Sequence, residues 1–510
     1  MNPSQNRTLE MKPIEPPSVE SLQSRCRAGI ARTDITPQVG IYHRMWGAAL
    51  HDRAAGIHRP LLGTILWLEP LAPEPNTAPA ACHIVIAIDH CVLDGDEMLR
   101  IRQGVAQAVE TSVDNISLTL SHTHGSGWMS RSRADLPGGE LIGPYLDRLA
   151  DQLQTLARTA RATLAPATIT HGYGRCSMAA HRDFWDPAAG RFVCGFNPTG
   201  PADDTLLIAR ISDDSGTTRA VLVNYACHPT TLAWDNRAIS PDWIGAMRET
   251  VESVAGGVCL FLQGASGDLG PRDGFVGDLG VADRNGRQVG HAVLSTLEAL
   301  PPDGTRFTYT GPVVSGTWIG TWRHVPLDER SLQRKAIWRW HRHTVELLYR
   351  PELPNMEDTL RQRASLESQE RAAKVAGDTA LERDFHAGVE QMNRQLFRLK
   401  TLPAGKVYPY SITIGQMGDA VWILVPAELY QVFQTTLRHR FAPRPVIIST
   451  LTDDWQPGYI PASSSYGYGI YQDVIAAVAP GSLEVLIKSV TRLVRKMLLE
   501  SEKAAAAESV

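Results

Sequence analysis

The chain has 510 residues, of which 43% are hydrophobic, and its formal net charge is −4. This composition supplies a full globular core and excludes a mainly disordered chain, while the balanced charge gives no basic face for nucleic acid or an anionic membrane. The longest apolar runs are far shorter than the roughly 18 to 20 residues that span a bilayer, so we expect no transmembrane segment and no nucleic-acid partner.

Residues 1–27 are polar and include prolines, without the charged start and apolar run of a secretory signal. We expect a flexible segment there. The seven cysteines are odd in number and form no CxxC pair, which is typical of reduced thiols rather than of a disulfide framework. Both observations predict a cytoplasmic protein.

From residue 28 to 325 the chain alternates short β-rich runs with helical patterns, which is typical of an α/β fold. Apolar positions three or four apart predict helices that cover a sheet. The predicted strands are 81–88, 116–120, 168–171, 206–210, 220–225 and 258–262, and the predicted helices are 97–111, 142–164, 241–254 and 285–300.

Residues 326–402 change character, because charged residues, glutamine and leucine dominate and glycine is rare. With Pro351 and Pro354 between the halves, this composition predicts a long helical hairpin inserted into the α/β core. The insertion is interpreted as a structural arm, and a surface for a partner chain is the alternative. Residues 403–500 are expected to complete the core, and residues 501–510 to form a frayed tail.

The strongest local signal is the segment 118–127, in which an apolar strand runs directly into His122 and His124. Alternation along an extended chain points both imidazoles to one face at the carboxyl end of the strand, where open α/β sheets bind ligands. Imidazole is the commonest metal ligand, so the pair suggests a zinc ion. A hydrogen-bonded turn without a metal is the alternative.

A second apolar strand ends at His228 and is stopped by Pro229. Two separate strands that each deliver a histidine favour zinc, because a tetrahedral site needs ligands from separate elements. The glycine-rich loop 262–271 either supplies backbone N–H groups to an anion or is an ordinary turn. By themselves, Glu428 after a strand and Tyr459 in a rigid turn are not informative.

These motifs, in this order, resemble the neutral/alkaline ceramidases, an α/β zinc amidase family, and among them the short bacterial relatives that consist of the catalytic domain. The resemblance covers about residues 28–472. Its matching stretches are 32–37, 56–60, 121–127, 224–230, 240–242, 262–268, 426–428 and 457–461.

The resemblance implies a role for each matching position. One Zn²⁺ would be held by four ligands, namely His122, His228, Glu428 and Tyr459. His124 would lie beside the ion as proton donor and stabiliser, and Arg182 would face the substrate. Zinc-activated water would attack a carbonyl, and the ion with His124 would stabilise the oxyanion.

Three departures from the family pattern bear on the substrate. Gly270 stands where the ceramidases carry a serine that faces the scissile amide, and His181 stands where an asparagine precedes the arginine. The chain also ends soon after the tyrosine loop, without the immunoglobulin-like domain and export signal of secreted ceramidases. We expect His181, Gly270 and Asp242 near the substrate.

The sequence therefore predicts a zinc hydrolase that cleaves the amide bond of a small polar N-acyl compound or of a lipid amide. A homo-oligomer is compatible with the sequence. Two alternatives stay open: a zinc hydrolase of esters, lactones, phosphoesters or glycosides, and a non-catalytic scaffold that uses residues 326–402 as an interaction arm.

Overall fold

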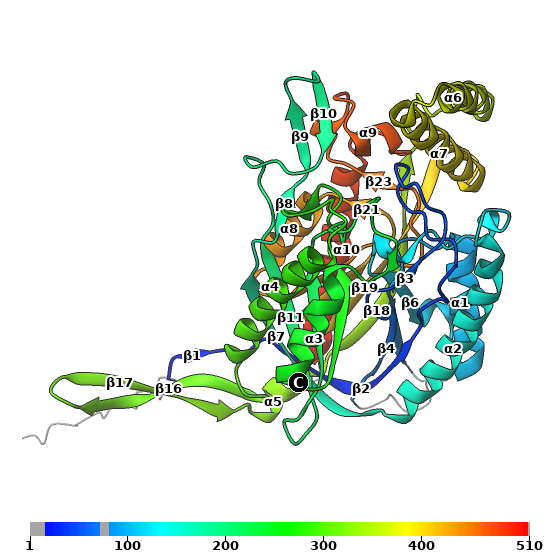
Figure 1. The fold of residues 1–510 in the computed structure, drawn as a ribbon. Coiled ribbons are helices and arrows are strands. Elements are labelled where there is room, and N and C mark those ends of the chain that lie inside the picture. Colours follow the sequence, from blue (N-terminus) through cyan, green and yellow to red (C-terminus); the bar gives the residue numbers. More distant parts are fainter. Residues whose placement is uncertain (1–15, 72–80, 508–510) are drawn as a thin grey trace, which may run out of the picture.

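A computed structural model describes residues 16–71 and 81–507, and its larger sheet has eight mixed strands. Their spatial order is β14 (Val258–Gln263), β12 (Thr218–Tyr225), β11 (Thr205–Ser212), β7 (Ala165–Arg175), β2 (Gln23–Asp34), β4 (Leu62–Glu69), β5 (His83–Ile88) and β6 (Ile116–Leu120). The β12–β14 and β5–β6 pairs are parallel, and the other neighbours are antiparallel. The predicted α/β class is confirmed (Figure 1).

A second sheet of four strands packs against one face of the first. It consists of β18 (Trp338–Leu348), β19 (Val407–Met417), β20 (Ala420–Leu424) and β22 (Val446–Ser449), in that order. One apolar cluster joins residues of β4, β5, β11 and β14 to Trp422, Leu424 and Ile447 of the second sheet. The two sheets are thus adjacent layers.

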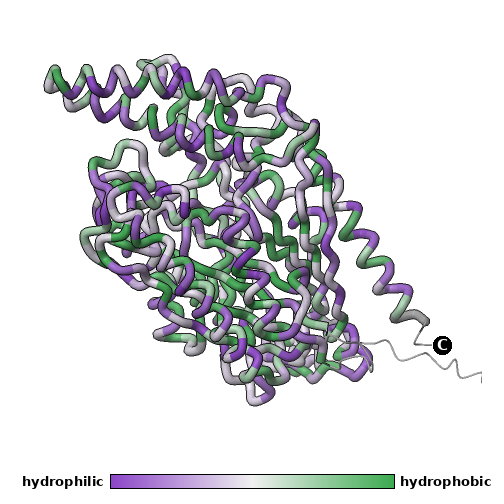
Figure 2. Tube along the Cα trace, turned by 90° about the vertical axis from the view of Figure 1, so that its right-hand side faces the viewer, coloured by the Kyte–Doolittle hydropathy of each residue, from purple (hydrophilic) through white to green (hydrophobic). Residues whose placement is uncertain are grey.

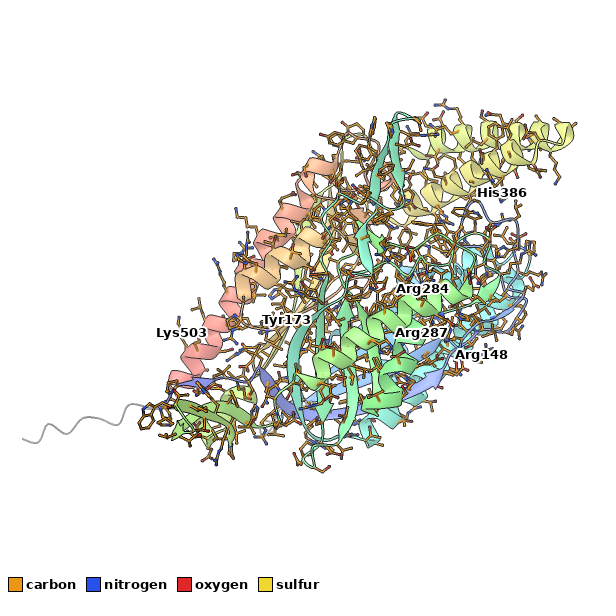
Figure 3. The ribbon with its side chains drawn as sticks, turned by 60° about the vertical axis from the view of Figure 1, so that its left-hand side comes forward. Arg148, Tyr173, Arg284, Arg287, His386 and Lys503 are labelled. Atoms are coloured by element: carbon orange, nitrogen blue, oxygen red, sulfur yellow. The ribbon has the colours of Figure 1, made fainter. Side chains whose placement is uncertain are left out.

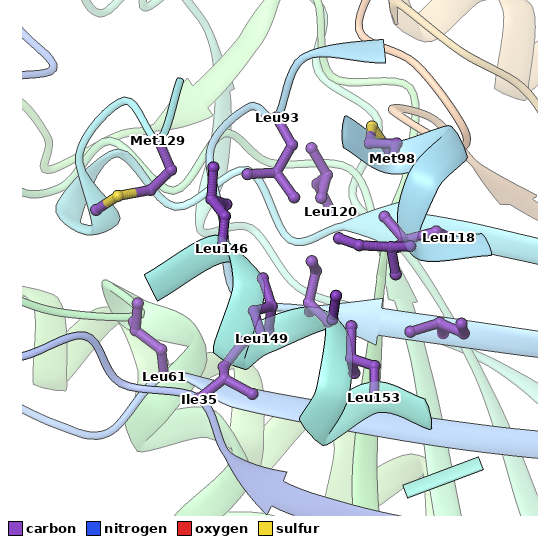
Figure 4. Packing of buried hydrophobic residues seen from close by; sticks show 14 of the residues in the cluster. Ile35, Leu61, Leu93, Met98, Leu118, Leu120, Met129, Leu146, Leu149 and Leu153 are labelled. Atoms are coloured by element: carbon purple, nitrogen blue, oxygen red, sulfur yellow. The ribbon is translucent and has the colours of Figure 1, made fainter. Parts of the chain in front are cut away.

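Helices cover the outer face of each sheet, which gives four layers. On the larger sheet lie α1 (Gly95–Val109), α2 (Ile142–Ala162), α3 (Trp243–Ala255) and α4 (Leu279–Glu298), and on the smaller lie α8 (Gln431–Phe441) and α10 (Ser482–Ala507). Figure 4 shows side chains of α2 and β6, such as Leu149 and Leu118, meeting in this interface. On α4, the exposed Arg284 and Arg287 lie on the outer side (Figure 3).

The two-sided burial explains the continuous apolar strands. In β5, Ile84, Ile86 and Ile88 pack under α1 and α2, whereas Val85 and Ala87 pack against the second sheet. Successive side chains of a strand point to opposite faces, so a strand between two packed layers must be apolar at every position.

The helical hairpin is shorter than predicted, and the bounds 326–402 are wrong. Residues 356–376 form α6 and residues 379–401 form α7, and the turn between them lies at Gly377, not at the prolines. Residues 329–335 form a short helix, α5, and residues 338–348 form β18. β18 is an edge strand that packs the partly buried Trp338 and Trp340 on one side and leaves His341 exposed, so it has no apolar run that would mark it as a strand in the sequence.

The two chain ends also differ from the prediction. β2 begins at Gln23, inside the segment expected to be flexible, and it is a central strand between β7 and β4. At the other end α10 continues to Ala507 instead of ending at residue 501. Residues 1–15 and 508–510 lie outside the described residues.

Two long extensions leave the body of the molecule. One is the hairpin of α6 and α7, which is mostly hydrophilic in Figure 2. The other is a β-hairpin of β16 (Thr305–Val314) and β17 (Trp318–Pro326), to which β1 (Ser18–Val19) adds a strand (Figure 1). Among the described residues, no helix combines the length and apolar composition needed to cross a bilayer.

A glycine sets the close approach of α3 and α4. A Cβ on Gly286 would lie 2.2 Å from the carbonyl oxygen of Trp243. We expect Gly286→Ala to lower the free energy of unfolding by about 1–3 kcal/mol, because both helices would have to move apart. Urea unfolding measures this, and Gly143→Ala in α2, where a Cβ has ordinary contacts, is the control. Equal stability of the two variants would contradict the prediction.

Candidate functional site

The four residues predicted as ligands lie together where the two sheets meet. His122 follows β6 and His228 follows β12, while Glu428 and Tyr459 are paired neighbours in the short parallel strands β21 (Glu428–Leu429) and β23 (Tyr459–Ile460). Glu428 Oε2 lies 3.1 Å from His122 Nε2 and 2.8 Å from His228 Nε2. The Tyr459 hydroxyl lies 3.3 Å from His228 Nε2.

Both imidazoles are oriented by backbone carbonyls. His122 Nδ1 donates to the Cys91 carbonyl at 2.9 Å, and His228 Nδ1 donates to the Ser266 carbonyl at 2.7 Å. With the proton on Nδ1, each Nε2 lone pair is directed at the Glu428 carboxylate. A histidine that binds a metal typically donates its other nitrogen in this way.

The donor set fits a divalent cation such as zinc. Ligand atoms of His122, His228 and Glu428 all lie within 4.8 Å of one another, and all three residues are buried. A second group of that size contains Cys91, His122 and His124. It is the weaker candidate, because Cys91 Sγ approaches the His122 nitrogen that already donates to a carbonyl.

Electrostatics favour a charged carboxylate between the two rings. Burial raises the pKa of Glu428, but His122 and His228 outweigh it and hold that pKa well below its usual range. Burial and the charge of Arg182 lower the pKa of His228 to about 4, so this ring is neutral. Burial lowers the pKa of His122, yet the charges of Cys91 and Glu428 raise it well above its ordinary value. A cation therefore competes with a proton at His122.

The backbone at His122 differs from the predicted extended chain. Its φ is 66°, in the left-handed region, and His124 begins a short 3₁₀ turn. The two rings still lie next to each other, with centroids 5.0 Å apart and planes at 83°. The turn, rather than strand alternation, brings both imidazoles to this position.

A cavity of about 450 Å³ lies beside this cluster. His124, Arg182 and Tyr459 are in its wall, together with the aromatic rings of Trp46, Trp234, Phe275 and Tyr471. Neither ring nitrogen of His124 has a hydrogen-bond partner among the described residues. Burial, then the charges of His122 and His228, lower its pKa well below the ordinary value.

Arg182 lies over Tyr459. Its guanidinium carbon is 5.3 Å from the centre of the phenol ring, and Nη2 donates to the Gly267 carbonyl at 2.7 Å. Burial raises the pKa of Tyr459 well above its ordinary value, and Arg182 offsets part of that rise. The arginine thereby favours the phenolate form that a cation would bind.

Helix α7 forms one side of the cavity. None of its residues was predicted from the sequence to be part of the site. The helix contributes Ala387, Glu390, Gln391, Arg394, Gln395 and Arg398. Glu390, Arg394 and Arg398 are four residues apart, a spacing that places them on one helical face. This spacing of charged residues along α7 is the sequence signal that could have indicated the cavity-facing side of the helix.

The three residues predicted to contact the substrate, Asp242, His181 and Gly270, lie in different surroundings. Asp242 is fully buried at the start of α3, and its oxygens accept from the backbone N–H groups of Leu232 and Trp243, so these contacts stabilise the fold and its substrate role stays a prediction. His181 is at the end of β8 (Ala179–His181), and its Nε2 lies 3.8 Å from Asp268 Oδ2. Among the described residues that line the cavity, His181 is not included. Gly270, in β15 (Leu269–Pro271), leaves space beside Arg182.

Two solved structures are similar to the whole arrangement. One is the neutral ceramidase from Pseudomonas aeruginosa, with a TM-score of 0.59 and 14% identity, and the other is described as a ceramidase complexed with C2, with a TM-score of 0.60 and 15% identity. Each alignment covers 92% of this chain and 74% of the other. The chain has the fold of the neutral ceramidases.

The likeness to the neutral ceramidases lies in the three-dimensional fold and not in the overall sequence. No family model matches the sequence, and no curated protein matches it. At 14 and 15% identity the likeness concerns the fold. The chemistry of this chain therefore depends on its own residues.

Proposed function

We propose that the protein is a zinc-dependent hydrolase that cleaves an amide bond in an N-acyl compound. The observation that carries the proposal is the convergence of His122 Nε2, His228 Nε2 and a Glu428 oxygen beside a cavity that Tyr459 lines, with both histidine tautomers set by backbone carbonyls. Tyr459 is the fourth proposed ligand, because its hydroxyl is beside the same atoms. The open cavity beside them is what a catalytic, rather than structural, zinc site requires.

When bound, a zinc ion supplies a Lewis acid and lowers the pKa of a coordinated water towards about 7. The protein residues would do the rest. Its lowered pKa favours the neutral form of His124, and neither of its ring nitrogens has a hydrogen-bond partner in the described part of the chain, so its N–H can donate to the oxygen on which negative charge develops. Arg182 would hold the substrate against Tyr459.

A substrate panel tests the bond class. Zinc-loaded protein would be assayed with N-acetylglucosamine, a short-chain ceramide, and a matched ester, lactone, phosphoester and glycoside, and zinc would be quantified in each preparation. We expect amide turnover that depends on zinc. Background amide turnover with rapid release from another bond class would replace the amidase proposal, and failure to take up zinc at all would favour a scaffold.

His124→Ala should separate catalysis from metal binding. We expect zinc content to stay near that of the wild type and kcat/KM to fall by about 10²- to 10⁴-fold, because the ring lines the cavity beside His122 and is not one of the four proposed ligands. His124→Gln should recover part of the rate through its amide N–H. His291→Ala, at an exposed position on α4, is the control. Loss of zinc in His124→Ala would exchange the roles of His122 and His124.

A further inference from the structure

Arg398 on α7 is a buried cation with no carboxylate partner in the described part of the chain. The residue is only 7% exposed, and among the described residues no aspartate or glutamate oxygen lies within 4 Å of its guanidinium. Burying an arginine without a counter-charge is costly. Such a group requires a partner that enters from elsewhere.

Its hydrogen bonds leave part of the guanidinium open. Nη1 donates to the Ile475 carbonyl at 2.8 Å and to Gln395 Oε1 at 3.0 Å, which fix the side chain in place. Nε has no partner among the described residues, and no hydrogen bond from Nη2 is seen there. Nε is itself enclosed by protein, whereas Nη2 is not, and Arg398 is part of the cavity wall, so Nη2 is the donor available to a bound molecule.

The neighbouring charges do not neutralise it. Three arginines, Arg182, Arg394 and Arg398, line the cavity with a single glutamate, Glu390, which is an excess of two positive charges. Glu390 is already engaged, because its Oε1 accepts from Arg133 at 2.8 Å and from Arg394 at 2.8 Å. Arg398 is the group on this side of the cavity that stays uncompensated.

We propose that Arg398 is the anion-binding residue of a substrate subsite built by α7, and that the substrate is an N-acyl compound carrying a carboxylate or phosphate. A guanidinium N–H makes a short, charge-assisted hydrogen bond to such oxygens, and Nη2 of Arg398 is free to make it. The aromatic rings of Trp46, Trp234 and Phe275 in the same cavity would receive the apolar part of the molecule. This inference rests on the proposed function for the amide, but the anion site is tested by binding alone.

Binding of matched ligands tests the site. Titration calorimetry on zinc-loaded protein would compare N-hexanoylglycine with N-hexanoylglycinamide, and N-hexylsuccinamic acid with N-hexylsuccinamide, which place the carboxylate on either side of the amide. N-hexanoylphosphoethanolamine would be compared with N-hexanoylethanolamine. We expect the anionic member of at least one pair to bind about tenfold tighter or more, and the pair that shows it identifies carboxylate or phosphate.

The variants assign that preference to Arg398. Arg398→Gln should lose the preference for the anion and leave the neutral ligands within about threefold, while Arg398→Lys should retain part of it. Arg383→Gln, on the exposed face of α7, is the matched control. Thermal unfolding and zinc content would confirm that each variant is folded and loaded.

Two results would overturn the proposal. One is equal affinity for both members of every pair, and the other is a preference that persists in Arg398→Gln, which would assign the anion to the metal or to Arg182. Hydrolysis is a separate readout: anion preference without turnover of any of these amides would retain the subsite and count against the amidase proposal.

Discussion

His228→Ala is expected to contain less than about a tenth of an equivalent of zinc and to show no hydrolysis above background. His228 Nε2 lies closest to Glu428 Oε2, at 2.8 Å, and also reaches the Tyr459 hydroxyl. Without the ring, the Glu428 carboxylate and the Tyr459 hydroxyl lose the nitrogen that lies beside both of them. A metal site with four ligands cannot keep its geometry when it loses one imidazole.

Metal analysis after gel filtration, together with the substrate panel, measures this effect. His122→Ala should behave in the same way, whereas His291→Ala on α4 should keep both zinc and activity. Circular dichroism would show that the variants are folded. Retention of nearly one equivalent of zinc in His228→Ala would remove this residue from the ligand set.

Arg248→Met is expected to destabilise the protein by about 3–5 kcal/mol. Arg248 of α3 makes two hydrogen bonds to Asp89, of 2.5 and 2.9 Å, and Asp89 is fully buried just after β5. Burial raises the pKa of Asp89, but Arg248 outweighs it and lowers the pKa below the usual value. Without the arginine an unpaired carboxylate would be buried under the helix layer.

Urea unfolding at pH 7 measures the loss, and Arg284→Met, whose partner Asp273 is exposed on the surface, should change stability by less than about 1 kcal/mol. Because the folded-state pKa of Asp89 is depressed, the stabilisation by the pair is present above about pH 4 and is lost as the pH falls further. The difference between wild type and variant should therefore shrink in acid. A constant difference down to pH 2 would mean that packing, not charge, explains the effect.

The apolar strands and amphipathic helices of the first half could be predicted because their buried positions are occupied by apolar residues at a regular spacing. β5 is apolar from Ile84 to Ile88, β6 alternates apolar residues with Ser117 and Thr119, and each ends beside the site. His122 and His228 were recognisable for the same reason, since each follows such a strand. Glu428 and Tyr459 came only from the resemblance, because a carboxylate and a phenol after short strands have many ordinary uses.

The composition gave wrong predictions for the secondary structure of elements that have one exposed side. β2 alternates buried positions with partly exposed ones such as Arg25 and Arg27, and β18 exposes its polar residues at the edge of a sheet. Neither strand has an apolar run. The role of α7 was hidden in a similar way, because Arg394 and Arg398 look like solvent-facing charges until the fold places both in the cavity wall and buries Arg398.

The separation of the proposed ligands along the chain has a consequence for how the protein matures. His122 and Glu428 are 306 positions apart, and His228 and Tyr459 are 231 apart. A ribosome must complete most of the polypeptide before these side chains can meet, so a metal ion can be captured only late, after both sheets have docked. Once captured, it would tie the amino-terminal and carboxyl-terminal halves together, and the metal-loaded protein should resist heat better than the metal-free form.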